Sequence, residues 1–231
     1  MTTTINREEI QKFSDLADEW WDVNGKFKPL HMFNPIRIEY ITEKIKQEFN
    51  LISRNNNFLK DLKILDIGCG GGLISEPLAR LGGEVTGIDA SEKNIKVAKL
   101  HSKKNNLDIN YFNKSPEQLN NSEKFDIVLN LEVVEHVENV DLYIKSCSNL
   151  LKKNGIMFTA TLNRTIISYI KAIVGAEYIL RWLPIGTHDW NKFIKPEELE
   201  KKLSLANFCT IDVKGLEFNP LFNKWKQSDN L

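Results

Sequence analysis

The sequence predicts an α/β fold: a doubly wound, mostly parallel sheet, with helices at the N-terminus and a helical insert near the C-terminal end. Short apolar runs alternate with stretches of helical length from residue 63 to residue 218, as parallel strands do when right-handed crossover helices join them. A glycine-rich segment, residues 66–72, directly follows the first apolar run and precedes a helical stretch. Sheets of this class bind ligands at such strand-to-helix turns.

Helices are expected ahead of the sheet. The apolar residues of the first segment recur at helical spacing, and they are Ile10, Phe13, Leu16, Ala17, Trp20 and Trp21. Asn24-Gly25 ends that run. A second helix is predicted after Pro35, over residues 36–49, and a polar linker follows it.

The rest of the chain alternates strand and helix. Strands are predicted at residues 64–67, 84–88, 109–113, 125–131, 155–162 and 208–218. Helices are predicted at residues 73–81, 93–105, 142–152 and 196–206. We expect one domain over residues 1–231, composed of a helical cap (1–60), a cofactor-binding core (61–162), an apolar helical insert (163–195) and a C-terminal helix and strand (196–231).

Composition narrows the class of protein. Lys plus Arg and Asp plus Glu both number 31, so no net field favours nucleic acid and no nucleic-acid partner is expected. The three cysteines form no Cys-x-x-Cys pair, which argues against a disulfide framework or a zinc knuckle. The first 13 residues include two glutamates and no apolar run, unlike a signal or transit peptide. These features predict a cytoplasmic protein.

The glycine-rich segment, Asp66-Ile67-Gly68-Cys69-Gly70-Gly71-Gly72, is the first candidate site. Glycines there let the backbone approach a ligand and adopt positive φ. Asp89 ends the next predicted strand, where a carboxylate can accept hydrogen bonds from ribose hydroxyls. A dinucleotide-binding loop would need glycine in place of Leu73, so the pattern argues against an NAD-linked oxidoreductase. The alternative reading of the loop is a structural turn.

The loop fits the acid-x-Gly-x-Gly-x-Gly signature of class I methyltransferases, in which Asp66 matches the acid. Four other segments resemble the ubiquinone-biosynthesis O-methyltransferase family closely. The first comprises residues 20–22, 25–31 and 34–37, and the second is Glu132-Val133-Val134-Glu135-His136-Val137. The third is Thr161-Leu162-Asn163-Arg164, and the fourth runs from residues 174–180 through residues 186–189. The resemblance covers residues 7 to 225.

The resemblance implies the cofactor, S-adenosylmethionine, and the residues that bind it. Arg37, Gly68, Asp89 and Leu131 match the family's cofactor contacts, and Asp66 and Gly70 belong to the loop signature. Arg37 suits the carboxylate of the methionine moiety, Gly68 a close backbone approach, and Asp89 the ribose. Each of two assignments keeps an alternative. For Arg37 it is a solvated helix residue, and for Leu131 it is an ordinary core residue.

The resemblance also implies the reaction. The family methylates phenolic hydroxyls of polyprenylated ubiquinone precursors, 2-polyprenyl-6-hydroxyphenol and 3-demethylubiquinol, and a ubiquinone-biosynthesis complex is an expected partner. Two rival hypotheses are a methyltransferase acting on another quinone, sterol or lipid, and a noncatalytic binding module. Intact acidic residues after the fourth predicted strand argue against the binding module.

These acidic residues are Glu132 and Glu135, followed by His136. A phenol has a pKa of about 10, so its methylation needs a nearby base or metal. Glu135 and His136 are the candidate catalytic residues, and the resemblance implies that Glu132, Glu135 and His136 bind a divalent ion such as Mg²⁺. Imidazole is an uncommon ligand for Mg²⁺, and the metal-ligand and proton-relay roles of His136 compete. The alternative is that these residues only mark the start of a helix, whose N-terminus Glu138 stabilises.

The insert between residues 165 and 183 is apolar in 13 of its 19 positions, but charged residues interrupt it. It is therefore a poor transmembrane span and a better lid for a polyprenyl tail. It also suits peripheral contact with the inner face of the cell membrane, where Tyr and Trp side chains are favourable. The alternative is an ordinary buried helix. After the strand predicted at 208–218, the sequence offers no segment for the final antiparallel strand of such sheets, so we expect the sheet edge to be completed differently.

Overall fold

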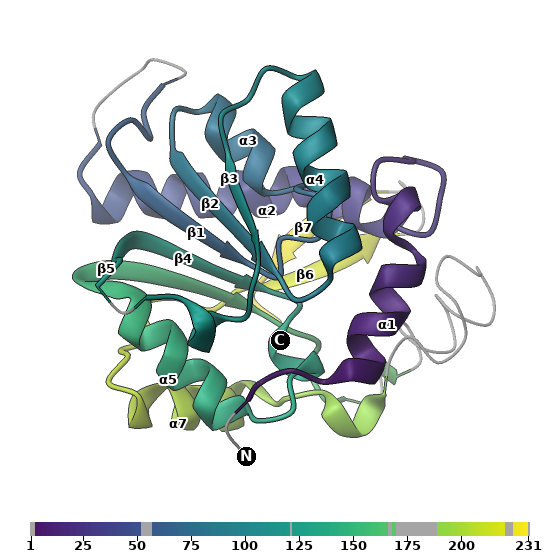
Figure 1. The fold of residues 1–231 in the computed structure, drawn as a ribbon. Coiled ribbons are helices and arrows are strands. Elements are labelled where there is room, and N and C mark those ends of the chain that lie inside the picture. The colour runs from purple at the N-terminus through teal and green to yellow at the C-terminus, as the bar shows by residue number, and fades with distance from the viewer. Residues whose placement is uncertain are drawn as a thin grey trace.

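The computed structural model describes residues 3–51, 57–120, 122–165, 168–169, 189–219 and 224–230. Within these residues the main sheet has five strands in the order β3-β2-β1-β4-β5, and every neighbouring pair is parallel (Figure 1). The strands are β1 (Lys63–Ile67), β2 (Glu84–Asp89), β3 (Asn110–Asn113), β4 (Phe125–Leu131) and β5 (Leu151–Ala160). The doubly wound parallel sheet predicted from the sequence is confirmed.

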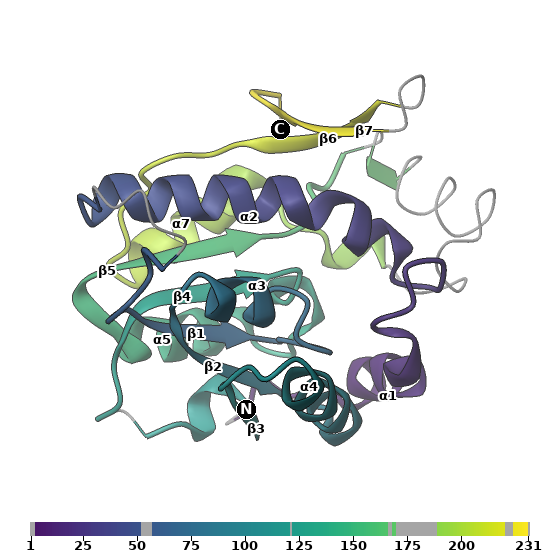
Figure 2. The ribbon, with the colours of Figure 1, turned by 90° about the horizontal axis from the view of Figure 1, so that it is seen from above.

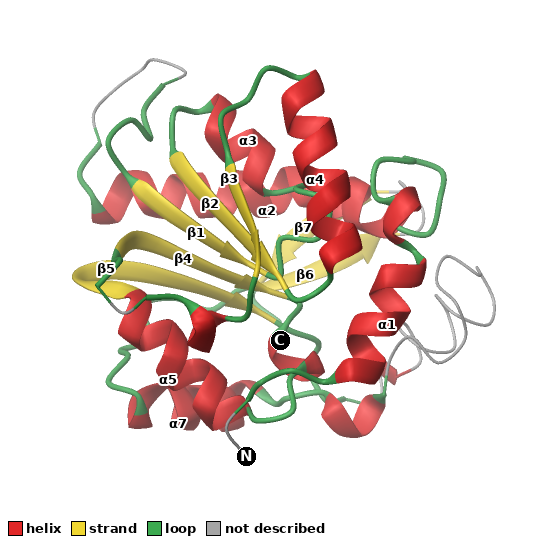
Figure 3. Ribbon diagram, viewed as in Figure 1, coloured by secondary structure: helices red, strands yellow, loops and turns green. Residues whose placement is uncertain are grey.

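Helices cover both faces of this sheet (Figure 3). The α-helices are α1 (Arg7–Asp15), α2 (Lys28–Glu48), α3 (Ser75–Arg80), α4 (Glu92–Lys104), α5 (Val140–Leu150) and α7 (Pro196–Leu205). Short 3₁₀ turns include η1 (Ala17–Glu19), η2 (Pro116–Gln118), η3 (Val134–His136) and η5 (Trp190–Lys192). The predicted core elements are present, with bounds that differ from prediction by four residues or fewer.

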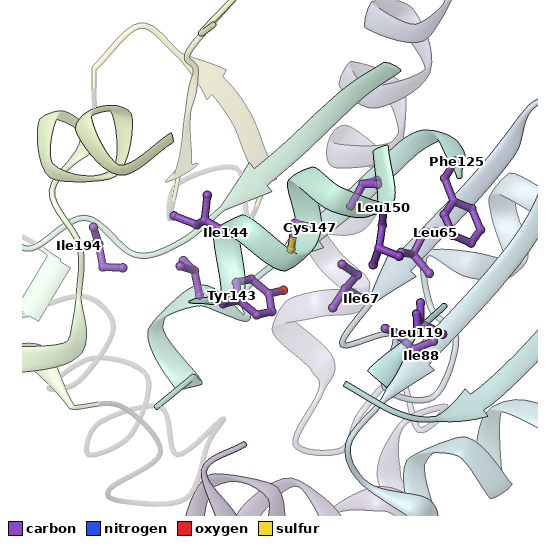
Figure 4. Close-up of a cluster of buried hydrophobic side chains, with 12 residues drawn as sticks. Leu65, Ile67, Ile88, Leu119, Phe125, Tyr143, Ile144, Cys147, Leu150 and Ile194 are labelled. Atoms are coloured by element: carbon purple, nitrogen blue, oxygen red, sulfur yellow. The ribbon is translucent and has the colours of Figure 1, made fainter. Parts of the chain in front are cut away.

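One face of the sheet packs against α5, with α7 beside it. The apolar side chains of α5 recur at helical spacing, so Tyr143, Ile144, Cys147 and Leu150 all point into one buried cluster with residues of β1 and β2 (Figure 4). All four are 1% exposed or less. Burying a large apolar side chain contributes about 1.5 to 3 kcal/mol, so this contact holds α5 firmly against β1, β2 and β4.

The opposite face packs against α2 and α3. Ile41 and Ile45 of α2 and Leu78 of α3 are fully buried against β1, β2 and β4. The prediction that the second helix begins after Pro35 is wrong, because α2 starts at Lys28 and contains Pro35. Proline removes one backbone donor inside a helix, but tertiary packing along α2 outweighs this local penalty.

The C-terminal strand also differs from prediction. The strand is β6 (Gly215–Asn219), shorter than 208–218, and it pairs antiparallel with β7 (Lys224–Ser228), outside the main sheet. Figure 2 shows this hairpin on the outer side of α2, where Trp225 makes an edge contact with Phe33. Asp212, in the segment before β6, forms an ion pair with Lys44 of α2. The prediction that no segment remains for another antiparallel strand is therefore wrong: β7 pairs with β6, and α2 separates this hairpin from the main sheet.

The apolar insert predicted at residues 163–195 lies largely outside the described residues, and its proposed lid or membrane face is not placed by the structure. Residue ranges 166–167 and 170–188 belong to this undescribed part. Among the helices that are described, none has both the length and the apolar character to span a bilayer.

Candidate active site

The candidate site lies where β1 and β4 end side by side. The crossover from β1 leads to α3 on one face of the sheet, whereas the crossover from β4 leads to α5 on the other. The carboxyl ends of these two strands therefore form a topological switch point, the usual ligand crevice of doubly wound sheets. Helix α1 lies at this edge, beside the arrowheads of the strands (Figures 1 and 2).

The glycine loop leaves β1 in a conformation that favours glycine. Gly68 and Gly70 have φ of 69° and 53°, in the left-handed region. The backbone N–H groups of Gly68 and Cys69 both donate to the carbonyl of Ile88, at 2.8 and 3.0 Å, which ties the loop to the end of β2. A Cβ on Gly68 would lie 2.4 Å from Cγ2 of Val133, so glycine is needed here for the loop after β4 to pack closely.

Asp89, at the end of β2, closes the other side of this loop. Its carboxylate accepts hydrogen bonds from the backbone N–H of Gly70 at 3.0 Å, the backbone N–H of Ser91 at 2.7 Å and the side-chain amide of Asn94 at 3.3 Å. Burial raises the pKa of Asp89 above its ordinary value, and these three donors partly oppose the effect. The carboxylate therefore holds the glycine turn in place while remaining only partly buried.

The aromatic pair Trp20-Trp21 packs on the same loop. The sequence pattern did not predict this contact. Trp20 donates its indole N–H to Asn94 at 2.9 Å, and Trp21 donates to the carbonyl of Gly71, also at 2.9 Å. A Cβ on Gly70 would lie 2.3 Å from the Trp20 ring. Glycine at position 70 thus leaves the space in which Trp20 packs on the loop.

Asp66 lies deeper, at the end of β1. It is 3% exposed, and its carboxylate accepts a 2.6 Å hydrogen bond from the Ser75 hydroxyl at the start of α3. Burial raises the pKa of Asp66 to about 7, despite the opposing effect of Ser75. The Asp66 carboxylate thus binds Ser75 of the chain itself, and this hydrogen bond fixes the turn from β1 into α3.

Asp66→Asn is expected to stabilise the ligand-free protein at about pH 8 by about 2 kcal/mol. An acid whose pKa is raised in the folded state favours folding while it is protonated, and this stability is lost as pH rises from about 4 to about 7. Asparagine keeps an oxygen that can accept from Ser75 without carrying the charge. Urea denaturation of both proteins at about pH 4 and pH 8 tests this; an equal or lower stability of the variant at pH 8 contradicts it.

Arg37 and Glu132 form an ion pair across the switch point. The Arg37 guanidinium, 8% exposed, donates to Glu132 at 2.6 Å, and its carbon atom lies 4.5 Å from the centre of the Phe33 ring. Glu132 has a positive φ of 56°. Leu131, the last residue of β4, is partly buried against the core shared with α2. Arg37 is thus not a solvated helix residue. Leu131 packs against the core while partly exposed, and its contact with the cofactor stays a prediction.

Glu135 and His136 lie in η3, just beyond β4. Glu135 is 4% exposed, and burial together with the charge of Glu132 raises its pKa to about 7. The Nδ1 atom of His136 lies 3.0 Å from Oε2 of Glu9 in α1. Burial acts to lower the pKa of His136, but the hydrogen bond to Glu9 and the neighbouring carboxylates raise it above the ordinary value. Sequence reasoning gave no signal for Glu9, which the fold brings into contact with His136.

The metal set predicted from Glu132, Glu135 and His136 is not assembled. Throughout the described ranges, no group of three or more His, Cys, Asp or Glu side chains is arranged to hold a metal ion. Glu132 is paired with Arg37, and Nδ1 of His136 is paired with Glu9. The spacing along the chain placed the three residues near one another, but long-range partners engage two of them.

The carboxyl edge of the sheet does suit a polar organic ligand. Within the described residues, several buried polar atoms on α2, after β4 and at or after the end of β5 have no hydrogen-bond partner, among them Asn34 Oδ1, Arg37 Nε, Glu135 Oε2, Thr159 Oγ1 and Asn163 Oδ1. Buried polar atoms are normally satisfied, so unpaired ones at a strand edge mark where a ligand can bind.

Comparisons with known proteins agree with this geometry. A family described as "Methyltransferase domain" matches residues 65–159. The magnesium protoporphyrin IX methyltransferase of Synechocystis PCC 6803, solved with bound SAH, has a similar fold, with a TM-score of 0.59 at 20% identity over 83% of this chain and 78% of that chain.

Curated relatives extend the similarity to nearly the whole chain. The ubiquinone biosynthesis O-methyltransferase of Pelagibacter ubique is 60% identical over 227 residues, which cover 98% of this chain and 94% of that protein. The protein of the same name from Bartonella tribocorum is 53% identical over 230 residues, covering 99% and 93%. The chain is therefore an S-adenosylmethionine-dependent methyltransferase and belongs to the ubiquinone biosynthesis O-methyltransferase family.

Proposed function

We propose that the protein transfers a methyl group from S-adenosylmethionine to a phenolic hydroxyl of polyprenylated ubiquinone precursors, 2-polyprenyl-6-hydroxyphenol and 3-demethylubiquinol. The observation that carries this proposal is the position of His136, a partly buried imidazole in η3, just beyond β4 and near the strand ends that carry the glycine loop. The names of relatives at 60% and 53% identity support the same class of acceptor.

The cofactor would be held at four places around the switch point. Arg37 would donate its unpaired Nε–H to the carboxylate of the methionine moiety, and Asp89 would accept from the ribose hydroxyls. Gly68 and Gly70 let the loop backbone approach the ligand, and Leu131 provides apolar contact. Asp66 contributes indirectly, because its bond to Ser75 sets the turn on which the loop depends.

His136 would act as the proton acceptor. S-adenosylmethionine supplies a methyl group on a sulfonium sulfur, a good leaving group, so the protein must chiefly orient and deprotonate the phenol. A phenol with a pKa of about 10 is mostly protonated at neutral pH, so a base near its oxygen increases the fraction that can attack. The buried Glu135 carboxyl, when ionised, stabilises the imidazolium that forms as His136 takes the proton. The proposal assigns no step to Mg²⁺, because Arg37 and Glu9 engage two of its predicted ligands.

The substrate would reach the site from a membrane surface. The polyprenyl tail is insoluble in water, and residues 165–183 carry 13 apolar residues, including aromatic ones. We therefore propose peripheral contact with the inner face of the cell membrane, within a ubiquinone-biosynthesis complex. Co-sedimentation of the protein with vesicles containing phosphatidylglycerol checks this; a protein that stays in the supernatant would contradict it.

The function is tested by methyl transfer from radiolabelled S-adenosylmethionine to a short-chain prenylated catechol, with Mg²⁺ and with a chelator. Label is expected in the phenolic ether. Label that persists in chelator would support a reaction without a metal, whereas label only with Mg²⁺ would restore the metal hypothesis. Binding of S-adenosylmethionine without transfer would contradict the proposed acceptor and keep the methyltransferase family.

A further inference from the structure

We infer that Trp20, in the helical cap, is a positioning residue for the cofactor: through the buried amide of Asn94 it orients the Asp89 carboxylate that would accept the ribose hydroxyls. The inference rests on the proposed role of Asp89 in binding S-adenosylmethionine. It assigns part of the cofactor site to a side chain that lies 74 residues from Asn94 in the sequence.

Asn94, in the first turn of α4, connects Trp20 to Asp89. Its Oδ1 accepts the indole N–H of Trp20 at 2.9 Å, and its Nδ2 donates to Oδ1 of Asp89 at 3.3 Å. Asn94 is 2% exposed. An indole N–H can only donate and an ionised carboxylate can only accept, so these two neighbours leave the amide a single orientation. Asn94 is therefore a fixed donor to Asp89.

The Asp89 carboxylate is held at both of its oxygens. Oδ1 accepts from the backbone N–H of Ser91 at 2.7 Å and from Asn94, whereas Oδ2 accepts from the backbone N–H of Gly70 at 3.0 Å. Within the described residues, Gly70 is the one hydrogen-bond partner of Oδ2. A carboxylate oxygen has two lone pairs, so Oδ2 keeps a position for a ligand hydroxyl. Asn94 thus helps to anchor the other oxygen, and so sets the direction in which Oδ2 points.

Trp20 also packs on the residue that donates to Oδ2. Its ring is stacked on Phe27, with ring centroids 3.8 Å apart and an interplanar angle of 5°, and Trp20 is 8% exposed. A Cβ on Gly70 would lie 2.3 Å from the Trp20 ring, so the ring lies directly against the glycine whose N–H binds Asp89. One side chain therefore holds two donors to the carboxylate, Asn94 by a hydrogen bond and Gly70 by packing.

A second contact from the helical cap reaches the same turn of α4. Oγ of Ser14 lies 2.7 Å from Oγ of Ser91. Ser91 is 2% exposed, and as the N-cap of α4 its Oγ accepts from the backbone N–H of Asn94 at 3.3 Å. Figures 1 and 2 both show α1, which carries Ser14, beside α4. The cap thus holds, at two points, the turn of α4 that donates twice to Asp89.

Apolar burial alone would explain the ring of Trp20 but not its N–H bond to Asn94. Trp20→Phe keeps an aromatic ring beside Phe27 and leaves the Asn94 oxygen without its donor. The amide is then free to turn, so we expect Kd for S-adenosylmethionine to rise about 5- to 20-fold.

Asn94→Asp tests the other end of the connection. It keeps the shape and the acceptor for Trp20, but replaces the donor to Asp89 with a carboxylate oxygen. Because like charges repel, we expect Kd for S-adenosylmethionine at about pH 8 to rise about 10- to 100-fold.

The experiment compares full-length wild type, Trp20→Phe, Asn94→Asp and Trp225→Phe. Trp225 is the matched control, because its indole N–H has no partner within the described residues and it lies on β7, on the outer side of α2. For each protein we would measure Kd for S-adenosylmethionine by calorimetry, KM for S-adenosylmethionine and kcat with a short-chain prenylated catechol, and Tm.

Trp20→Phe and Asn94→Asp are expected to raise Kd and KM for S-adenosylmethionine, with kcat at saturating cofactor within about twofold of wild type. Trp225→Phe is expected to match wild type in all three. A merely structural role for Trp20 would lower Tm and leave Kd of the folded protein unchanged.

A ligand without ribose hydroxyls tests whether the effect passes through Asp89. Trp20→Phe should weaken the binding of S-adenosylhomocysteine about 5- to 20-fold, but that of its analogue lacking both ribose hydroxyls by less than about twofold. An equal loss for both ligands, or wild-type Kd in folded Trp20→Phe and Asn94→Asp, would overturn the inference. Wild-type Kd in Asp89→Ala would instead overturn the proposed ribose site. Normal cofactor binding without methyl transfer would contradict the proposed acceptor alone, so the failures are distinguishable.

Discussion

Asp89→Ala is expected to weaken the binding of S-adenosylmethionine by about 100-fold or more. The carboxylate is the proposed acceptor for two ribose hydroxyls, and hydrogen bonds to a charged group contribute about 1.5 kcal/mol or more each. Its removal also leaves the N–H groups of Gly70 and Ser91 without their acceptor, so the glycine turn loses its anchor to β2. Calorimetric titration of the folded variant with S-adenosylmethionine measures the effect.

Asp126→Ala is the matched control for this prediction. Asp126 also accepts a backbone N–H, that of Lys63 at 2.9 Å, and pairs with Lys152, but it lies near the start of β4, at the opposite edge of the sheet. Its loss is expected to lower stability while leaving cofactor affinity unchanged. An unchanged affinity in Asp89→Ala would mean that the ribose binds elsewhere.

His136→Ala is expected to lower kcat by about 10² to 10⁴, with little change in the affinity for S-adenosylmethionine. The imidazole is the proposed base, whereas the proposed cofactor contacts lie on the glycine loop, on α2 and at the ends of β2 and β4. Glu135→Ala is expected to show the same pattern, retained cofactor affinity with lost turnover, because the buried Glu135 carboxyl stabilises the imidazolium. Steady-state rates with a short-chain prenylated catechol, combined with calorimetry, check both variants.

Exogenous imidazole offers a further check on His136→Ala. Partial recovery of the rate with added imidazole would identify the missing group as a proton acceptor, because a small base can occupy the space left by the ring. A variant that turns over at the rate of wild type would assign deprotonation to another group. Parallel loss of kcat and cofactor affinity would place His136 among the cofactor contacts instead.

Local patterns in the sequence determined the sheet and the position of the glycine loop. The alternation of apolar runs and helical stretches is a short-range signal, and strands from β1 to β5 occur close to where it predicted them. The glycine loop and Asp89 are likewise recognisable because strand ends at one edge of a parallel sheet meet there. The family was identified from segments outside this core, and relatives over nearly the full chain confirm it.

Long-range contacts decided the rest. The pairing of Arg37 with Glu132 joins residues 95 apart, and that of Glu9 with His136 joins residues 127 apart. No periodic pattern in the sequence predicts either pair, because each contact depends on how α1 or α2 packs against the sheet. The same docking retains Pro35 inside α2 and places the β6–β7 hairpin on its outer side. Spacing along the chain could bring Glu132, Glu135 and His136 together, but only the tertiary structure showed which side chains engage them, because ion pairs form between neighbours in space.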